Sequence, residues 1–104
     1  MHVIADMQGM DIIMLDIGDI SLLADYFVIC TARVDRQARA IQERVAQHLK
    51  AQGLMPLSTE GDAAGGWTIL DYGVVIVHIF ALAERQYYQL EELWSEASVV
   101  MKMP

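Results

Sequence analysis

Cysteine and long apolar runs are scarce in this 104-residue sequence, and both shortages restrict the class of protein. The single cysteine, Cys30, cannot form an intramolecular disulfide or a multi-cysteine zinc site. It ends the apolar run YFVIC, where a free cysteine is most often a small core residue. No segment approaches the ~20 apolar residues of a membrane span, and the first ten residues are unlike a signal peptide. We therefore expect a soluble protein of a reducing compartment.

Basic residues are few as well: seven Lys and Arg stand against fourteen Asp and Glu, a formal net charge of −7. Negative charge repels nucleic-acid phosphates, so we expect little direct nucleic-acid contact and a basic protein as partner. Five of the seven basic residues lie between Arg33 and Lys50. They are interspersed with Glu43 and glutamines and carry no aromatic residue for base stacking, which is typical of a solvent-exposed helix face.

The glycine patterns of a nucleophile elbow, a P-loop or a dinucleotide site do not occur, and Gly65 and Gly66 precede an expected strand. The three histidines are far apart in the sequence, which argues against a zinc cluster. His78 lies in an apolar strand pattern, so we interpret it as a hydrogen-bonded core histidine. No catalytic residue, metal or cofactor is therefore predicted.

One catalytic alternative stays open, because several aspartates lie at or near expected strand ends. Carboxylates that converge there can build a metal-dependent phosphoryl-transfer site, for which Asp16 and Asp71 are the candidates. Aspartate is also common at strand ends because the chain turns there, and no Asp-x-Asp pair occurs on one strand.

The apolar pattern predicts strands over residues 11–16, 26–30, 67–71 and 74–80, with the last two as a hairpin. Pro56 opens a further extended segment over residues 56–61, and its proline indicates an edge strand. A helix should run to Gly53, and a second should cover residues 81–94. The buried stripe of the first helix comprises Val34, Ala38, Ile41, Val45 and Leu49, and that of the second Ala83, Tyr87, Leu90, Leu93 and Trp94. Arg85 and Tyr88 should then be exposed.

These elements predict one α/β domain over residues 11–98, a mixed sheet of about five strands flanked by helices. Residues 1–10 form a short N-terminal segment in this scheme, and residues 99–104 form a C-terminal tail.

Six separate strings carry a family resemblance in order and spacing from Asp11 to Trp94: DIIMLDI, SLLADYFVIC, RQARAIQERV, GLMPLSTEG, WTILDYGVVIVHIF and ERQYYQLEELW. The sequence resembles the ribosomal silencing factor family, also called Iojap-like. The resemblance implies a sandwich similar to that of nucleotidyltransferases, without their activity.

The resemblance further implies a translational repressor that binds the large ribosomal subunit through its ribosomal protein fourteen. Bound there, it would block association with the small subunit when nutrients are short. Organellar relatives act in large-subunit assembly, which is the alternative function, and a homodimer is implied as well. We expect a bacterial cytoplasmic location, with an organelle as the alternative.

The family motifs fall on residues that we expect to bind the partner: Trp67, Leu70, Asp71, Tyr72, Arg85 and Tyr88. Tryptophan, tyrosine and arginine most often anchor protein interfaces, so Trp67, Arg85 and Tyr88 are the expected anchors. Asp71 fits both a turn and a charge partner. Val74 stands where the family usually has aspartate, and either weaker ribosome binding or a longer strand would follow from it.

Overall fold

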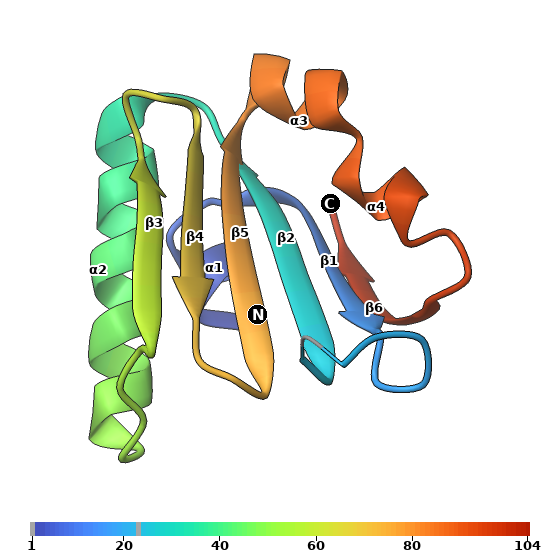
Figure 1. The fold of residues 1–104 in the computed structure, drawn as a ribbon. Coiled ribbons are helices and arrows are strands. Elements are labelled where there is room, and N and C mark those ends of the chain that lie inside the picture. Colours follow the sequence, from blue (N-terminus) through green and yellow to red (C-terminus); the bar gives the residue numbers. More distant parts are fainter. Residues whose placement is uncertain (1, 23) are drawn as a thin grey trace.

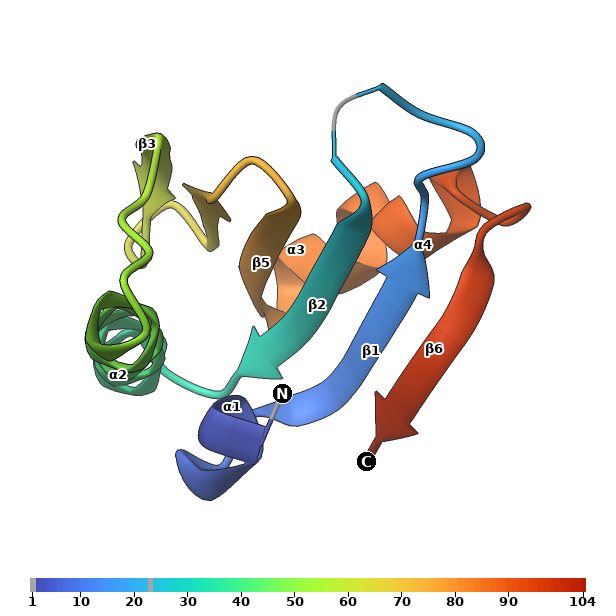
Figure 2. The same ribbon diagram turned by 90° about the horizontal axis from the view of Figure 1, so that it is seen from below.

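The computed structural model describes residues 2–22 and 24–104, which form a six-stranded sheet with helices on both faces (Figures 1 and 2). The strands are β1 (Met10–Asp16), β2 (Tyr26–Ala32), β3 (Ser58–Asp62), β4 (Trp67–Asp71), β5 (Val75–Ala81) and β6 (Ser98–Met103). Their order is β3-β4-β5-β2-β1-β6. The central pair β2 and β5 is parallel, and the other neighbouring strands are antiparallel. The predicted mixed sheet is confirmed, with six strands where about five were expected.

The helices divide between the two faces of the sheet. In Figure 2, α1 (His2–Asp6) and α2 (Asp35–Ala51) lie on one side, and α3 (Leu82–Tyr88) and α4 (Leu90–Leu93) on the other. No helix of the described residues is long and apolar enough to cross a bilayer.

The predicted amphipathic pattern of α2 is confirmed apart from its first residue. Ala38, Ile41 and Val45 are buried at spacings of three and four, whereas Val34 lies before the helix and is 62% exposed. Gly53 ends the helix as predicted, with φ 85°. Its N–H donates to the Lys50 carbonyl and the next N–H to the Leu49 carbonyl, the bond pattern of a Schellman cap.

Strands β2 and β5 are apolar on both faces, so the protein has two cores, one on each side of the sheet. The α2-side core contains Cys30, Ile41 and Val77, and the opposite core contains Phe27 and Phe80. Cys30 is fully buried, as predicted, and burial raises the pKa of its thiol to about 12. The thiol is therefore protonated and unreactive at neutral pH.

Residues near both ends of the described chain form more secondary structure than the sequence predicted. The expected tail forms β6, which pairs antiparallel with β1 and makes one edge of the sheet. Its side chains are almost all exposed, so the strand carries little apolar periodicity to predict it. At the other end Ile4, in α1, is 2% exposed and packs in the α2-side core.

The expected helix over residues 81–94 is interrupted at Gln89, whose backbone is left-handed with φ 46°. Because α3 and α4 do not share one helical wheel, the predicted faces are partly wrong. Tyr87 is 80% exposed and Leu93 74% exposed, although both were expected to pack. Leu90 is buried, as predicted, and Trp94 is half-buried.

Gly61→Ala should destabilise the fold more than Gly53→Ala, although both glycines have positive φ. A Cβ at Gly61 would overlap the Trp67 backbone carbonyl on the neighbouring strand, whereas a Cβ at Gly53 meets nothing within 4 Å. The backbone penalty is common to both variants, and overpacking adds about 1–3 kcal/mol at Gly61 alone. Urea unfolding monitored by circular dichroism measures the difference; equal losses in the two variants would contradict this packing.

Candidate protein-docking surface

Trp67 begins β4 and is the centre of a group of aromatic rings on the sheet face that carries α3. Register pairs it with Phe80 on β5, and the two rings stack with centroids 4.8 Å apart. Tyr88, from α3, packs against the indole with ring centroids 4.7 Å apart. Tyr87 contacts Tyr88 edge-on, with ring centroids 5.0 Å apart. Trp67 is half-buried, Tyr88 is 45% exposed and Tyr87 is 80% exposed. We call Trp67, Tyr87 and Tyr88 the aromatic surface.

A buried histidine holds the indole in place. His78 is 5% exposed, and its Nδ1 accepts a 3.1 Å hydrogen bond from Trp67 Nε1. That bond requires the neutral ring with its proton on Nε2. Burial lowers the pKa of His78 to about 4, so this form dominates at neutral pH. Phe27 contacts the imidazole edge-on at 4.7 Å. The prediction of a hydrogen-bonded core histidine is confirmed.

Arg85 was expected to be exposed, but its side chain is only 13% exposed and joins three elements. Its Nη1 donates to Thr31 Oγ1 on β2 at 2.9 Å. Its Nε donates to Glu91 Oε2 on α4 at 2.9 Å, and Nη2 lies 2.8 Å from the same oxygen. The guanidinium therefore fixes α3 against the sheet and against α4 across the break at Gln89.

Leu70 and Tyr72 lie in the α2-side core, on the opposite face from the aromatic surface. They are 2% and 6% exposed, so their side chains offer a partner almost no area. Burial also raises the pKa of the Tyr72 hydroxyl, which has no hydrogen-bond partner among the described residues. Two of the six expected partner-binding residues thus support the hairpin from inside.

Asp71 ends β4 in the turn to β5, where its Oδ1 accepts the Gly73 N–H at 2.8 Å. It lies four residues from Trp67, roughly 13 Å along the strand, at the opposite end of the sheet from α3 (Figure 1). Asp71 therefore has the expected role in the turn. A partner that contacts both Asp71 and the aromatic surface would have to extend along the whole length of β4. Val74 lies in the bend before β5, 54% exposed, and does not lengthen the strand.

The structure does not bring the two candidate catalytic aspartates together. Asp16 on β1 and Asp71 on β4 are separated by β2 and β5, which places the strands roughly 14 Å apart. One metal ion cannot bridge such a gap. Within residues 2–22 and 24–104, no group of three or more His, Cys, Asp or Glu side chains could hold a metal ion.

The structure therefore brings together Trp67 and Tyr88, adds Tyr87, and assigns Arg85 to their support. Sequence reasoning missed Tyr87 because Gln89 carries no glycine or proline signal for the break that turns this tyrosine outward. The hydrogen bond between Trp67 and His78 was also missed. The alternation of side chains along the strand could have predicted it. Ile69 pairs with His78 across the hairpin, and Trp67, two residues before Ile69, points to the same face of the sheet.

Buried His78 predicts a loss of stability in acid. The folded protein keeps this ring neutral down to about pH 4, whereas in the unfolded chain it binds a proton below 6.5. The free energy of unfolding should therefore fall as the pH drops from 6.5 to 4, by about 3 kcal/mol from this group. His78→Leu should lose that part of the dependence and exposed His48→Gln should keep it, as measured by urea unfolding at each pH. An equal acid slope in wild type and His78→Leu would contradict the assignment.

Three similarities to known proteins agree with this fold. The family model described as "Ribosomal silencing factor during starvation" (RsfS) matches residues 1–104. The chain is 40% identical over 92 residues to the ribosomal silencing factor RsfS of Bacillus subtilis, covering 88% of this chain and 78% of that protein. A crystal structure of a Chromobacterium violaceum protein superposes with a TM-score of 0.86 at 32% identity, covering 96% of this chain and 85% of that one.

A more distant relative comes from an organelle. The mouse protein named "Mitochondrial assembly of ribosomal large subunit protein 1" is 28% identical over 88 residues, covering 82% of this chain and 39% of that protein. The family match extends over every residue, and the bacterial relative is similar over most of its own length. This chain belongs to the ribosomal silencing factor family.

Proposed function

We propose that this protein is a ribosomal silencing factor. It binds the large ribosomal subunit through ribosomal protein fourteen and blocks association with the small subunit. The observation that supports the proposal most is the family match over residues 1–104, together with a relative named for this function at 40% identity. The aromatic surface is the proposed docking contact.

The chemistry of the aromatic surface suits a protein partner. Tryptophan and tyrosine bury much area with few rotatable bonds, so they dominate the binding energy of many interfaces. Here both rings are fixed before binding, Trp67 by its bond to His78 and Tyr88 by packing on the indole. Little side-chain entropy is then lost when the partner docks.

The proposed mechanism is steric, without a bond made or broken, and the protein is proposed to act as a regulator and not as an enzyme. Occupation of the joining surface is sufficient to keep the subunits apart. The net charge of −7 favours encounter with a basic ribosomal protein and disfavours binding to ribosomal RNA. A bacterial cytoplasmic location follows from the same proposal.

Large-subunit assembly is the second candidate, because the mouse relative is named for that role. Both functions would use the same docking surface. They differ in outcome, since an assembly factor would bind large-subunit precursors without inhibiting subunit joining.

We also propose a homodimer, because the family resemblance implies one. The outer edge of β6 is a candidate contact, because its backbone faces solvent and its Val99 and Val100 side chains are 55% and 51% exposed.

Tyr88→Ala should weaken binding to isolated large subunits by roughly 30-fold, the equivalent of ~2 kcal/mol for an interface anchor. Trp67→Ala should weaken it at least as much, because it also removes the ring on which Tyr88 packs. Co-sedimentation measures binding, and light scattering measures inhibition of subunit joining.

Met55→Ala is the matched control, because this residue is 62% exposed and follows α2 on the other side of the molecule. It should bind as the wild type does. If Tyr88→Ala stays folded and binds like the Met55 control, the aromatic surface is not the docking contact. If the wild type itself does not sediment with large subunits, the proposed function is wrong.

A further inference from the structure

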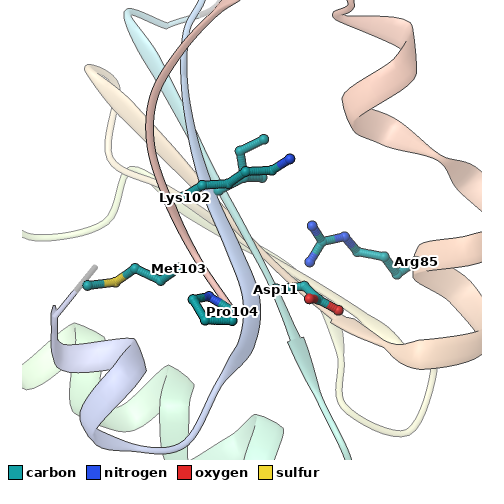
Figure 3. Close-up of a pocket in the computed structure, with 6 residues that line it drawn as sticks. Asp11, Arg85, Lys102, Met103 and Pro104 are labelled. Atoms are coloured by element: carbon teal, nitrogen blue, oxygen red, sulfur yellow. The ribbon is translucent and has the colours of Figure 1, made fainter.

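A small pocket of about 270 Å³ lies beside the aromatic surface, between α3 and the paired strands β1 and β6 (Figure 3). Ile13 forms part of its wall, with Met103 and Pro104 from the chain end. The charged ends of Asp11, Arg85 and Lys102 face the same space in Figure 3. An adjoining hollow shares these charged residues and adds Glu91. One continuous recess thus combines apolar wall area with charges of both signs.

Two of these charged side chains have no polar side-chain contact among the described residues. Among the described residues, neither Asp11 nor Lys102 makes a side-chain hydrogen bond or an ion pair. Arg85 is only partly satisfied, since its bonds to Thr31 and Glu91 leave some of the five guanidinium N–H groups unused. A free carboxylate and two cationic groups with unused donors therefore line one small space.

The backbone of Asp11 has an unusual conformation. Its φ is +47°, a left-handed conformation that non-glycine residues rarely adopt, although aspartate and asparagine tolerate it best. It lies where the register between β1 and β2 shifts between Met10 and Ile13, the irregularity of a β-bulge. Bulges often redirect a side chain beside a functional site, and local strain of this kind collects at such sites.

We propose that this pocket binds a free α-amino acid with an aliphatic side chain. The α-ammonium group would bind Asp11, the α-carboxylate would bind Arg85 and Lys102, and the side chain would lie on Ile13 and Pro104. Asp11, Glu91, Arg85 and Lys102 carry no net charge together, which matches a zwitterion. The volume of the pocket without the adjoining hollow, about 270 Å³, lies just under the ~300–1,000 Å³ of pockets for drug-sized ligands, so this part of the recess fits a smaller molecule.

Other ligand classes match the pocket less well. A divalent cation would be repelled by Arg85 and Lys102, and a simple anion would be repelled by Asp11 and Glu91. Nucleotides are disfavoured because no glycine is among the described residues that line the recess, and the residue from the first turn of α4, Glu91, is acidic and would repel phosphate.

The pocket would couple to docking through Arg85, an inference that rests on the proposed function. A ligand carboxylate competes with Glu91 for the guanidinium, and that pair holds α3, which carries Tyr88, against α4. An occupied pocket should therefore loosen one wall of the aromatic surface. Amino-acid abundance would then weaken binding to the large subunit, and scarcity would favour silencing.

Titration of the ¹⁵N-labelled full chain with L-leucine tests the site by NMR, without the ribosome. Leucine should shift the amide signals of Ile13, Lys102 and Met103 saturably at millimolar concentration. N-acetyl-L-leucine and L-leucinamide, each lacking one charge, should bind at least tenfold more weakly. Asp11→Asn and Lys102→Gln should lose leucine affinity to the same extent, and asparagine keeps the left-handed backbone tolerable.

The exposed charges Asp19 and Lys50 supply the matched controls, because Asp19→Asn and Lys50→Gln change the same charges outside the pocket. Both should bind leucine as the wild type does. Equal binding of leucine and its two derivatives, or no saturable shift at all, would overturn the site.

Co-sedimentation with and without leucine tests the coupling separately. Leucine should reduce large-subunit binding of the wild type and leave that of Asp11→Asn unchanged. A wild type that binds leucine and large subunits independently would overturn the coupling. A wild type that binds leucine but not large subunits would instead overturn the proposed function.

Discussion

The two central strands, β2 and β5, need cover on both faces, and the rest of the architecture depends on how that cover is distributed. Their parallel pairing places apolar side chains on each side of the sheet, from Val28 and Val77 on one face to Phe27 and Phe80 on the other. The 17-residue α2 covers the first face, whereas only the short helices α3 and α4 lie over the second. Aromatic rings complete the second layer and remain partly open to solvent, and this incompletely covered face is the one that we propose as the binding face.

Polar contacts stabilise this thin second layer. Arg85 connects α3 to β2 and α4, and His78 orients Trp67 from beneath. Both side chains are largely removed from water, which strengthens their hydrogen bonds and makes the loss of a partner costly. The residues that support the aromatic surface are thus distinct from those that would touch a ribosomal protein. Helix α3 carries both kinds, with Arg85 as support and Tyr88 in the aromatic surface.

Much of the fold was predictable because the central elements are periodic. The hairpin of β4 and β5, the buried face of α2 and the core positions of Cys30 and His78 all followed from apolar spacing, and Pro56 indicated the edge position of β3. Strand β6 did not, because an edge strand with exposed side chains has no inward face to mark it. The left-handed Gln89 was equally invisible, and a break there reversed the expected roles of Tyr87 and Arg85. In the candidate site, Leu70 was expected to bind the partner because it lies next to Asp71 in the motif. Side chains alternate along a strand, however, and Leu70 points into the core.

Photo-crosslinking from position 88 tests the proposed docking most directly. Tyr88 is replaced by p-benzoylphenylalanine, which keeps an aromatic ring at this half-exposed position, and the protein is irradiated on isolated large subunits. Ribosomal protein fourteen should be the crosslinked product, and the same probe at Met55 should give none. Crosslinks from position 88 to ribosomal RNA or to another protein, or equal yields from both positions, would contradict docking through the aromatic surface.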